Sequence, residues 1–203
     1  MAIMSMRSRK RTFEVAAAAL LCLSAFLVQT LLLNRFFFSG VICSLPLTIT
    51  IVWGLVFGSP LPRITAHELR KKSLAQIFVR QLAAGSPGGM LLGLFFAGLY
   101  ASLIPHYPVA FPLIGWIAGY VCLRSLSQGN LLCVPLTFVL TVAAEGLMSW
   151  ELVLLKRTAV FEHLAVVVFP EALINAIIAP FIYIPLRQWY EISEGQRNSL
   201  AME

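Results

Sequence analysis

Long apolar stretches are the feature of this sequence that most limits how the chain can fold. Six segments carry almost no charge over lengths near those needed to cross a bilayer: residues 13–33, 36–57, 88–104, 108–123, 131–150 and 164–186. A helix needs about 20 apolar residues to cross the hydrocarbon core. Chain inside lipid must also satisfy its own backbone polar groups, which a helix does. The pattern predicts an all-α integral membrane protein with about six transmembrane helices.

The overall composition agrees with a membrane environment. Hydrophobic residues make up 59% of the chain and charged residues 12%, whereas about a quarter of the residues in soluble domains are charged. The formal net charge of +6 comes from basic residues clustered beside apolar segments, where they set orientation and contact anionic headgroups. We therefore expect membrane lipid, and not nucleic acid, as the partner of this charge.

The basic residues also predict the orientation. With the N-terminus inside, twelve Lys and Arg residues fall on the cytoplasmic side and three, Arg35, Lys156 and Arg157, fall outside. Such an imbalance follows the positive-inside rule and an even number of spans. Both termini are therefore expected in the cytoplasm, with the chain a multi-pass membrane protein.

The predicted organisation has five parts. They are a basic cytoplasmic N-terminus (1–12), a first transmembrane hairpin (13–57), a cytoplasmic basic amphipathic segment (58–87), a four-helix transmembrane region (88–187) and a cytoplasmic tail (188–203). The first apolar run is longer than a typical signal-peptide core, so we expect a retained span instead of a cleaved signal. The basic segment could lie in the interface of an anionic leaflet or form a solvated linker helix.

Small residues recur at helical spacing in the third and fourth apolar segments. A four-residue spacing relates Gly85, Gly89, Gly93, Ala97 and Ala101, and Gly115 and Gly119 repeat that spacing in the fourth segment. Small residues let helix backbones approach closely in lipid. They predict either packing among this protein's own helices or a docking face for a partner helix.

A few polar residues lie at membrane depth. Arg35 follows the first apolar segment, Glu145 lies in the fifth, and Glu171 and Asn175 share a face of the sixth. Charged groups inside a membrane find partners or mark ion and proton pathways. We hypothesise that Arg35 neutralises one of the glutamates. Pro180 removes a hydrogen bond within the sixth segment and predicts a kink there.

Catalytic patterns are missing from the sequence. All nine acidic residues are Glu, and the three histidines, His67, His106 and His163, fall in different connections. The sequence contains neither a phosphate-binding glycine loop nor a zinc-protease motif. We therefore expect a protein without enzymatic activity, cofactor or metal.

The sixth segment resembles the C-terminal span of the rod shape-determining protein MreD family. That family has an Asn, a Pro five residues later, an aromatic residue and a basic residue at the membrane exit, which are similar to Asn175, Pro180, Tyr183 and Arg187 here. The glycine-rich hairpin formed by the third and fourth segments is also similar to that family's. The resemblance extends over residues 88–187 and identifies the chain as a divergent member.

The resemblance implies a non-enzymatic scaffold of the bacterial cell-elongation machinery, located as a multi-pass protein in the bacterial cytoplasmic (inner) membrane. It implies MreC as a partner, together with MreB and the RodA-type glycosyltransferase with its transpeptidase. It also implies a fold similar to the substrate-binding membrane subunits of energy-coupling-factor vitamin transporters. Such a transporter subunit is the alternative function, with Trp150 and the polar residues as pocket candidates. An assembly factor for another membrane complex is a third reading.

Overall fold

The computed structural model describes residues 20, 23–31, 43–59, 73, 76, 85–103, 108–123, 129–155 and 164–199. Its elements are helices: a helical stretch at 23–31, α2 (Leu45–Phe57), α5 (Pro87–Leu103), α6 (Ala110–Val121), α7 (Gly129–Leu154) and α8 (Leu164–Ser199). The all-α prediction is therefore confirmed for this part of the chain. Arg35 and most of the predicted basic segment lie outside the described residues.

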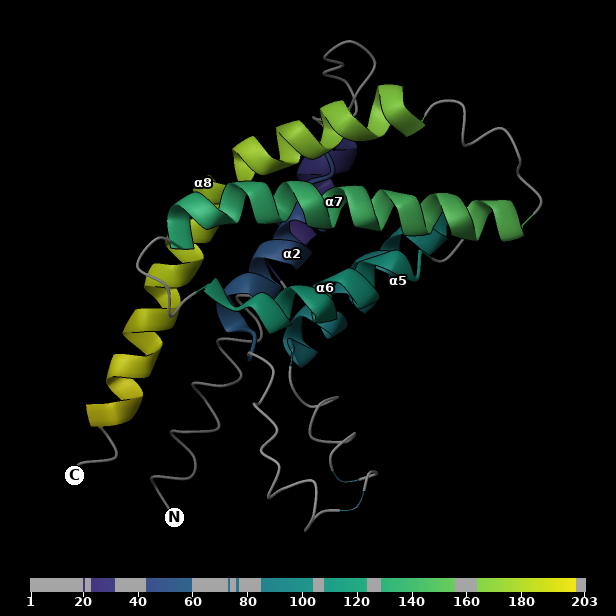
Figure 1. The fold of residues 1–203 in the computed structure, drawn as a ribbon. Coiled ribbons are helices and arrows are strands. Elements are labelled where there is room, and N and C mark those ends of the chain that lie inside the picture. The colour runs from purple at the N-terminus through teal and green to yellow at the C-terminus, as the bar shows by residue number, and fades with distance from the viewer. Residues whose placement is uncertain are drawn as a thin grey trace.

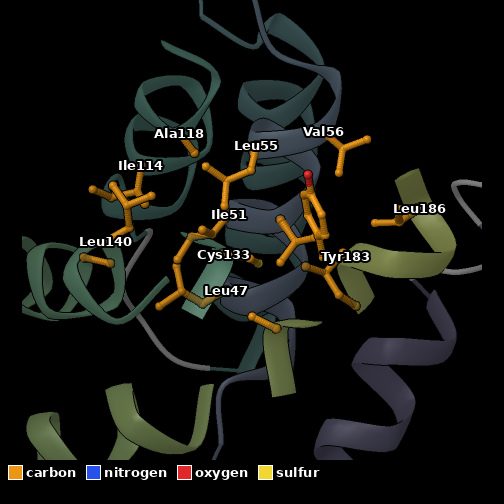
Figure 2. Packing of buried hydrophobic residues seen from close by; sticks show 14 of the residues in the cluster. Leu47, Ile51, Leu55, Val56, Ile114, Ala118, Cys133, Leu140, Tyr183 and Leu186 are labelled. Atoms are coloured by element: carbon orange, nitrogen blue, oxygen red, sulfur yellow. The ribbon is translucent and has the colours of Figure 1, made fainter. Parts of the chain in front are cut away.

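Helix α2 occupies the centre of the fold. It contacts α5, α6, α7 and α8, and Figure 1 places it behind α7, between α8 and the α5–α6 pair. Its side chains are almost all buried. Figure 2 shows Leu47, Ile51 and Leu55 of α2 facing Ile114 and Ala118 of α6 and the ring of Tyr183 from α8. The core therefore forms around one apolar helix and not between two layers.

The polar side chains of α2 are satisfied within the helix itself. The Thr48 hydroxyl donates to the carbonyl of Ser44 at 2.9 Å, and the Thr50 hydroxyl donates to that of Pro46 at 2.8 Å. A threonine that bonds the preceding turn can be buried at little cost, because its hydroxyl leaves no unpaired donor. Two threonines thus fit inside a central apolar helix.

Among the described residues, α7 and α8 are the two helices that are long and apolar enough to cross a membrane, over Leu131–Leu154 and Val166–Ile192. They pack side by side in Figure 1. α5 and α6 are shorter, at 17 and 12 residues. At 1.5 Å per residue α6 is about 18 Å long, less than a hydrocarbon core of about 30 Å. Helix α6 is therefore shorter than a helix that crosses the whole hydrocarbon core.

Helix α8 extends beyond the predicted sixth segment. It continues to Ser199, so the boundary predicted at residue 188 does not coincide with a helix end. Figure 1 shows that α8 changes direction along its course. Pro170, Pro180 and Pro185 lie inside this helix, and proline within a helix is the usual cause of such a bend because it removes a hydrogen bond and crowds the preceding turn.

The two ends of the predicted basic segment meet beside α6. Ser59 and Gly85 exchange two backbone hydrogen bonds of 2.7 and 2.8 Å. The Ser86 amide donates to the carbonyl of Trp116 at 3.2 Å, and the Cys122 thiol donates to that of Gly58 at 3.2 Å. These bonds hold the end of α2 and the beginning of α5 against the C-terminal half of α6.

Candidate functional site

Three of the predicted intramembrane polar residues belong to one cluster. Glu145 lies on α7, and Glu171 and Asn175 lie one turn apart on α8. The carboxylates of Glu145 and Glu171 are close enough to interact electrostatically, and the Asn175 amide faces Glu171. The packing of α7 against α8 therefore brings Glu145 toward two residues that lie 26 and 30 positions later in the sequence.

Asn175 connects α8 to the beginning of α2. Its side chain is fully buried, and its Oδ1 accepts hydrogen bonds from the Ser44 amide at 3.0 Å and the Cys43 thiol at 3.1 Å. Ser44 is the N-cap residue of α2 and makes no side-chain capping bond itself. Since the first amides of a helix have no partner within the helix, Asn175 supplies an acceptor that the local sequence lacks.

A second side chain caps the same helix. The Oε1 of Gln29, from the helical stretch at 23–31, accepts a hydrogen bond from the Leu45 amide at 2.9 Å. Gln29 is itself buried. Two amide side chains from distant parts of the chain therefore satisfy the buried N-terminus of α2. Gln29 was not predicted as a site residue, although an amide inside an apolar segment was a signal for it.

Further polar groups border the glutamates from other elements. The Tyr100 hydroxyl on α5 interacts electrostatically with both carboxylates, and the Cys43 thiol interacts with Glu171. The Tyr100 ring also packs edge-on against Phe26 and Phe111, at 5.7 and 5.5 Å between ring centroids. Tyr100 was not singled out in the sequence, because one tyrosine in an apolar helix is an ordinary core residue.

Positive charge is scarce among the described residues. Arg187 is the only Lys or Arg whose side chain falls within them, and it pairs with Glu191 on the next turn of α8 at 2.9 Å. The hypothesis that Arg35 neutralises Glu145 or Glu171 concerns a residue outside the described ranges. In the part of the chain that the structure describes, no Lys or Arg side chain pairs with Glu145 or Glu171.

The predicted small residues lie where helices approach most closely. A Cβ atom added to Gly93 would lie 2.6 Å from backbone atoms of Phe111 and Pro112, and one on Gly89 would meet the Gly115 carbonyl. A Cβ on Gly119 would meet the backbone of Gly85 and Ser86. These contacts lie between α5, its preceding turn and α6. The geometry corresponds to packing within this protein.

The row of small residues from Gly85 to Ala101 differs from its prediction at one end. Gly85 precedes α5 and has a φ of 85°, a left-handed conformation that glycine adopts without steric cost. Its place in the turn, and not the helical spacing, therefore explains the glycine. Ala97 is fully buried within α5, while Ala101 is half-buried near the C-terminus of that helix.

Helix α2 packs against α6 through a second set of small residues. A Cβ on Gly54 would lie 2.7 Å from the Ala118 Cβ and from the Gly115 carbonyl oxygen, and one on Gly58 would meet the Gly119 backbone. Because residues four apart on α2 meet residues four apart on α6 in the same order, the two helices run parallel.

An aromatic cluster lies at the C-terminal end of α2. Trp53 stacks on Phe57 at 4.4 Å between ring centroids, and Phe57 contacts Trp189 and Tyr190 of α8 edge-on at 6.1 and 5.6 Å. Tryptophan and tyrosine favour the boundary between lipid and water. The cluster was not predicted, because its members on α2 and its members on α8 are more than 130 residues apart in the sequence.

The outward surfaces of the helices are apolar. One face of α8 exposes six large apolar side chains at three- and four-residue spacing: Val166, Phe169, Leu173, Ile177, Phe181 and Ile184. On α7, Trp150 is 61% exposed. An exposed apolar face of this length is typical of a surface covered by lipid or by another helix.

Within the described residues, His, Cys, Asp and Glu form no group of three or more that could hold a metal ion. Comparisons with protein-family models, curated proteins and solved structures found no match to the chain. The candidate site therefore rests on the geometry of the polar cluster and of the glycine contacts.

Proposed function

We propose that the chain is a six-span protein of the bacterial cytoplasmic (inner) membrane with both termini in the cytoplasm. Helix directions support this span count. In the proposed numbering α2, α6 and α8 are the second, fourth and sixth spans, so all three must run in the same direction. The matching Gly54–Gly115 and Gly58–Gly119 contacts make α6 parallel to α2.

The direction of α8 gives the same result. Its Asn175 meets Ser44 at the beginning of α2, whereas its Trp189 meets Phe57 at the end of α2. Helix α8 is therefore parallel to α2. The aromatic cluster then lies at the cytoplasmic boundary of the membrane, next to Arg187, and the glutamate cluster lies toward the outer side.

Reporter fusions test this topology. A reporter protein that folds only in the cytoplasm should be active after Arg197 and inactive after His106. Activity after His106, or its absence after Arg197 in a fusion that accumulates, would contradict the proposed orientation or span count.

We further propose that the protein is a non-enzymatic scaffold of the cell-elongation machinery, similar to MreD. The supporting observation is where the residues that carry the resemblance lie. Asn175 caps α2 from inside the fold, Tyr183 is fully buried, and Gly115 and Gly119 lie at contacts that admit no side chain. The motif positions are thus those that hold the helices together, which suits a protein whose task is to present a stable surface.

The exposed faces suit binding within the membrane. An apolar face on α8, together with the exposed Leu91, Leu94 and Phe95 on α5, offers helical surfaces to lipid and to the spans of other proteins. The proposed partners are MreC, the RodA-type glycosyltransferase with its transpeptidase, and MreB on the cytoplasmic side.

Depletion of the protein in its bacterial host tests the scaffold proposal. Rod-shaped cells should become round or fail to elongate, without a new nutrient requirement, and MreC should co-purify with the protein from solubilised membranes. Normal cell shape after verified depletion would contradict the scaffold function.

One observation favours the alternative function, the substrate-binding subunit of an energy-coupling-factor vitamin transporter. The structure gathers Glu145, Glu171, Asn175 and Tyr100 from three helices on the proposed outer side, and a vitamin site needs such convergent polar groups. A vitamin requirement in depleted cells, together with uptake of that vitamin by cells expressing the protein, would favour the transporter subunit over the scaffold.

A further inference from the structure

The beginning of α6 is bound to a group that marks one edge of a membrane. The Val109 amide donates a hydrogen bond to a carboxylate oxygen of Glu151 at 3.2 Å. Glu151 lies near the end of α7, directly after the exposed Trp150. A carboxylate is costly in hydrocarbon, and tryptophan favours the boundary between lipid and water. The beginning of α6 therefore lies at the outer edge of the hydrocarbon core.

The other end of α6 meets backbone that is not helical. Cys122 ends the helix with a φ of 34°, and its thiol donates to the carbonyl of Gly58 at 3.2 Å. The next residue, Ser59, is exposed. Exposed backbone without helical hydrogen bonds does not occur inside lipid, and the aromatic contact of Phe57 with Trp189 lies directly beside it. This end of α6 therefore lies at the cytoplasmic edge of the core.

The distance between these two edges is short for a bilayer. Val109 and Val121 are 12 positions apart, which is about 18 Å along a helix, whereas a hydrocarbon core is about 30 Å thick. Helix α5, which packs against α6 at its glycines, has 17 residues and is about 25 Å long. A long helix such as α7 can fit a thin region by tilting, but a short helix cannot lengthen, and the bilayer then adapts to it.

We propose that the bilayer thins to about 20 Å of hydrocarbon beside the α5–α6 pair, and that the outward face of this pair binds phospholipids with short acyl chains. Long acyl chains would cover the Glu151 carboxylate and the turn at Ser59, whereas short chains end level with both. This inference rests on the proposed six-span topology. The exposed apolar side chains of the face include Leu91, Leu94, Phe95 and Leu113.

Cysteine labelling at three positions of α6 tests the thickness in the full-length protein. The variants Val109→Cys, Leu113→Cys and Val121→Cys alter side chains that are 54%, 38% and 39% exposed. The probe is a maleimide that cannot cross membranes, applied to intact cells and to inverted membrane vesicles. Val109→Cys should react only from outside and Val121→Cys only from the cytoplasmic side. Leu113→Cys matches Val121→Cys in exposure and should react from neither side, because acyl chains cover it.

The outcomes separate the thin bilayer from the topology. A core of about 30 Å covers at least one of two positions that lie only about 18 Å apart on a spanning helix. Protection of Val109→Cys or Val121→Cys would therefore overturn the thin bilayer and leave six spans in place. Reaction of both from the same side would contradict the six-span topology and the proposal with it. Reaction of Leu113→Cys would mean that water, and not lipid, covers this face, which also overturns the proposal.

A second measurement needs no substitution. The wild-type protein is reconstituted in vesicles of phosphatidylcholine with acyl chains of about 14, 18 or 22 carbons, and its thermal unfolding is measured in each. The unfolding temperature should be highest in the shortest lipid and fall as the chains lengthen, because each added ångström of mismatch costs free energy. An unfolding temperature that stays constant or rises with chain length would overturn the proposal.

Discussion

Gly93 offers the sharpest test of the helix contacts, because its neighbours on α6 are backbone atoms. A Cβ added to Gly93 would lie 2.6 Å from the carbonyl carbon and oxygen of Phe111 and from the Cα of Pro112. Ordinary van der Waals contact begins at 3.4 Å. Backbone atoms inside a helix cannot rotate away as a side chain can. Gly93→Ala must therefore separate α5 from α6, and Gly93→Leu must separate them further.

The expected size of the effect follows from the cost of overpacking. Inserting extra carbon atoms into a well-packed contact costs about 1–3 kcal/mol, which reduces the ratio of folded to unfolded protein roughly 5- to 150-fold. Alanine should lie near the lower end and leucine at or above the upper end. Since a native fold is stabilised by only about 5–15 kcal/mol, Gly93→Leu should strongly reduce the amount of folded protein in the membrane.

Gly98 provides a matched control on the same helix. It is exposed, and a Cβ added there has nothing within 4 Å. Gly98→Leu introduces the same side chain into α5 at a position where the described residues leave its Cβ in open space. The assay measures the protein that remains monodisperse after detergent extraction and mild heating, for the wild type and for both leucine variants, at equal expression.

The two leucine variants separate internal packing from partner docking. We expect Gly93→Leu to lose folded protein and Gly98→Leu to retain it. If Gly93→Leu stays folded and loses only co-purification with MreC, the row of small residues on α5 is an external docking face. If both variants behave like the wild type, the argument from close approach is wrong.

Two other predictions concern buried polar groups. Asn175→Leu removes the acceptor that caps α2 and leaves the Ser44 amide unpaired, so thermal unfolding in detergent should show that the free energy of unfolding falls by about 1–3 kcal/mol. The control Ile177→Ala, on the exposed face of the same helix, should have a much smaller effect. Equal effects of the two variants would contradict the capping role. Thr141 is fully buried with no hydrogen-bond partner for its hydroxyl, so Thr141→Val should leave stability unchanged or raise it slightly. A loss above about 1 kcal/mol in Thr141→Val would mean that the hydroxyl makes a bond absent from this structure.

The sequence predicted the helical class and the approximate positions of five helices, because long apolar segments between basic connections allow few other structures. It also identified Gly89, Gly93, Gly115 and Gly119 as close-packing positions from their spacing. It did not reveal which helix each glycine contacts, since spacing defines a face of one helix and says nothing about its neighbour.

Tertiary structure alone decided which polar residues meet. Spacing placed Glu171 beside Asn175 on one helix, but only the packing of α7 on α8 brought Glu145 to them. Likewise, the buried N-terminus of α2 lacks a local cap, and its acceptors come from Gln29 and Asn175, 16 and 131 residues away in the sequence. Local patterns determine what a helix can bury, whereas hydrogen bonds and charge pairs between helices depend on contacts that form only when the whole bundle assembles.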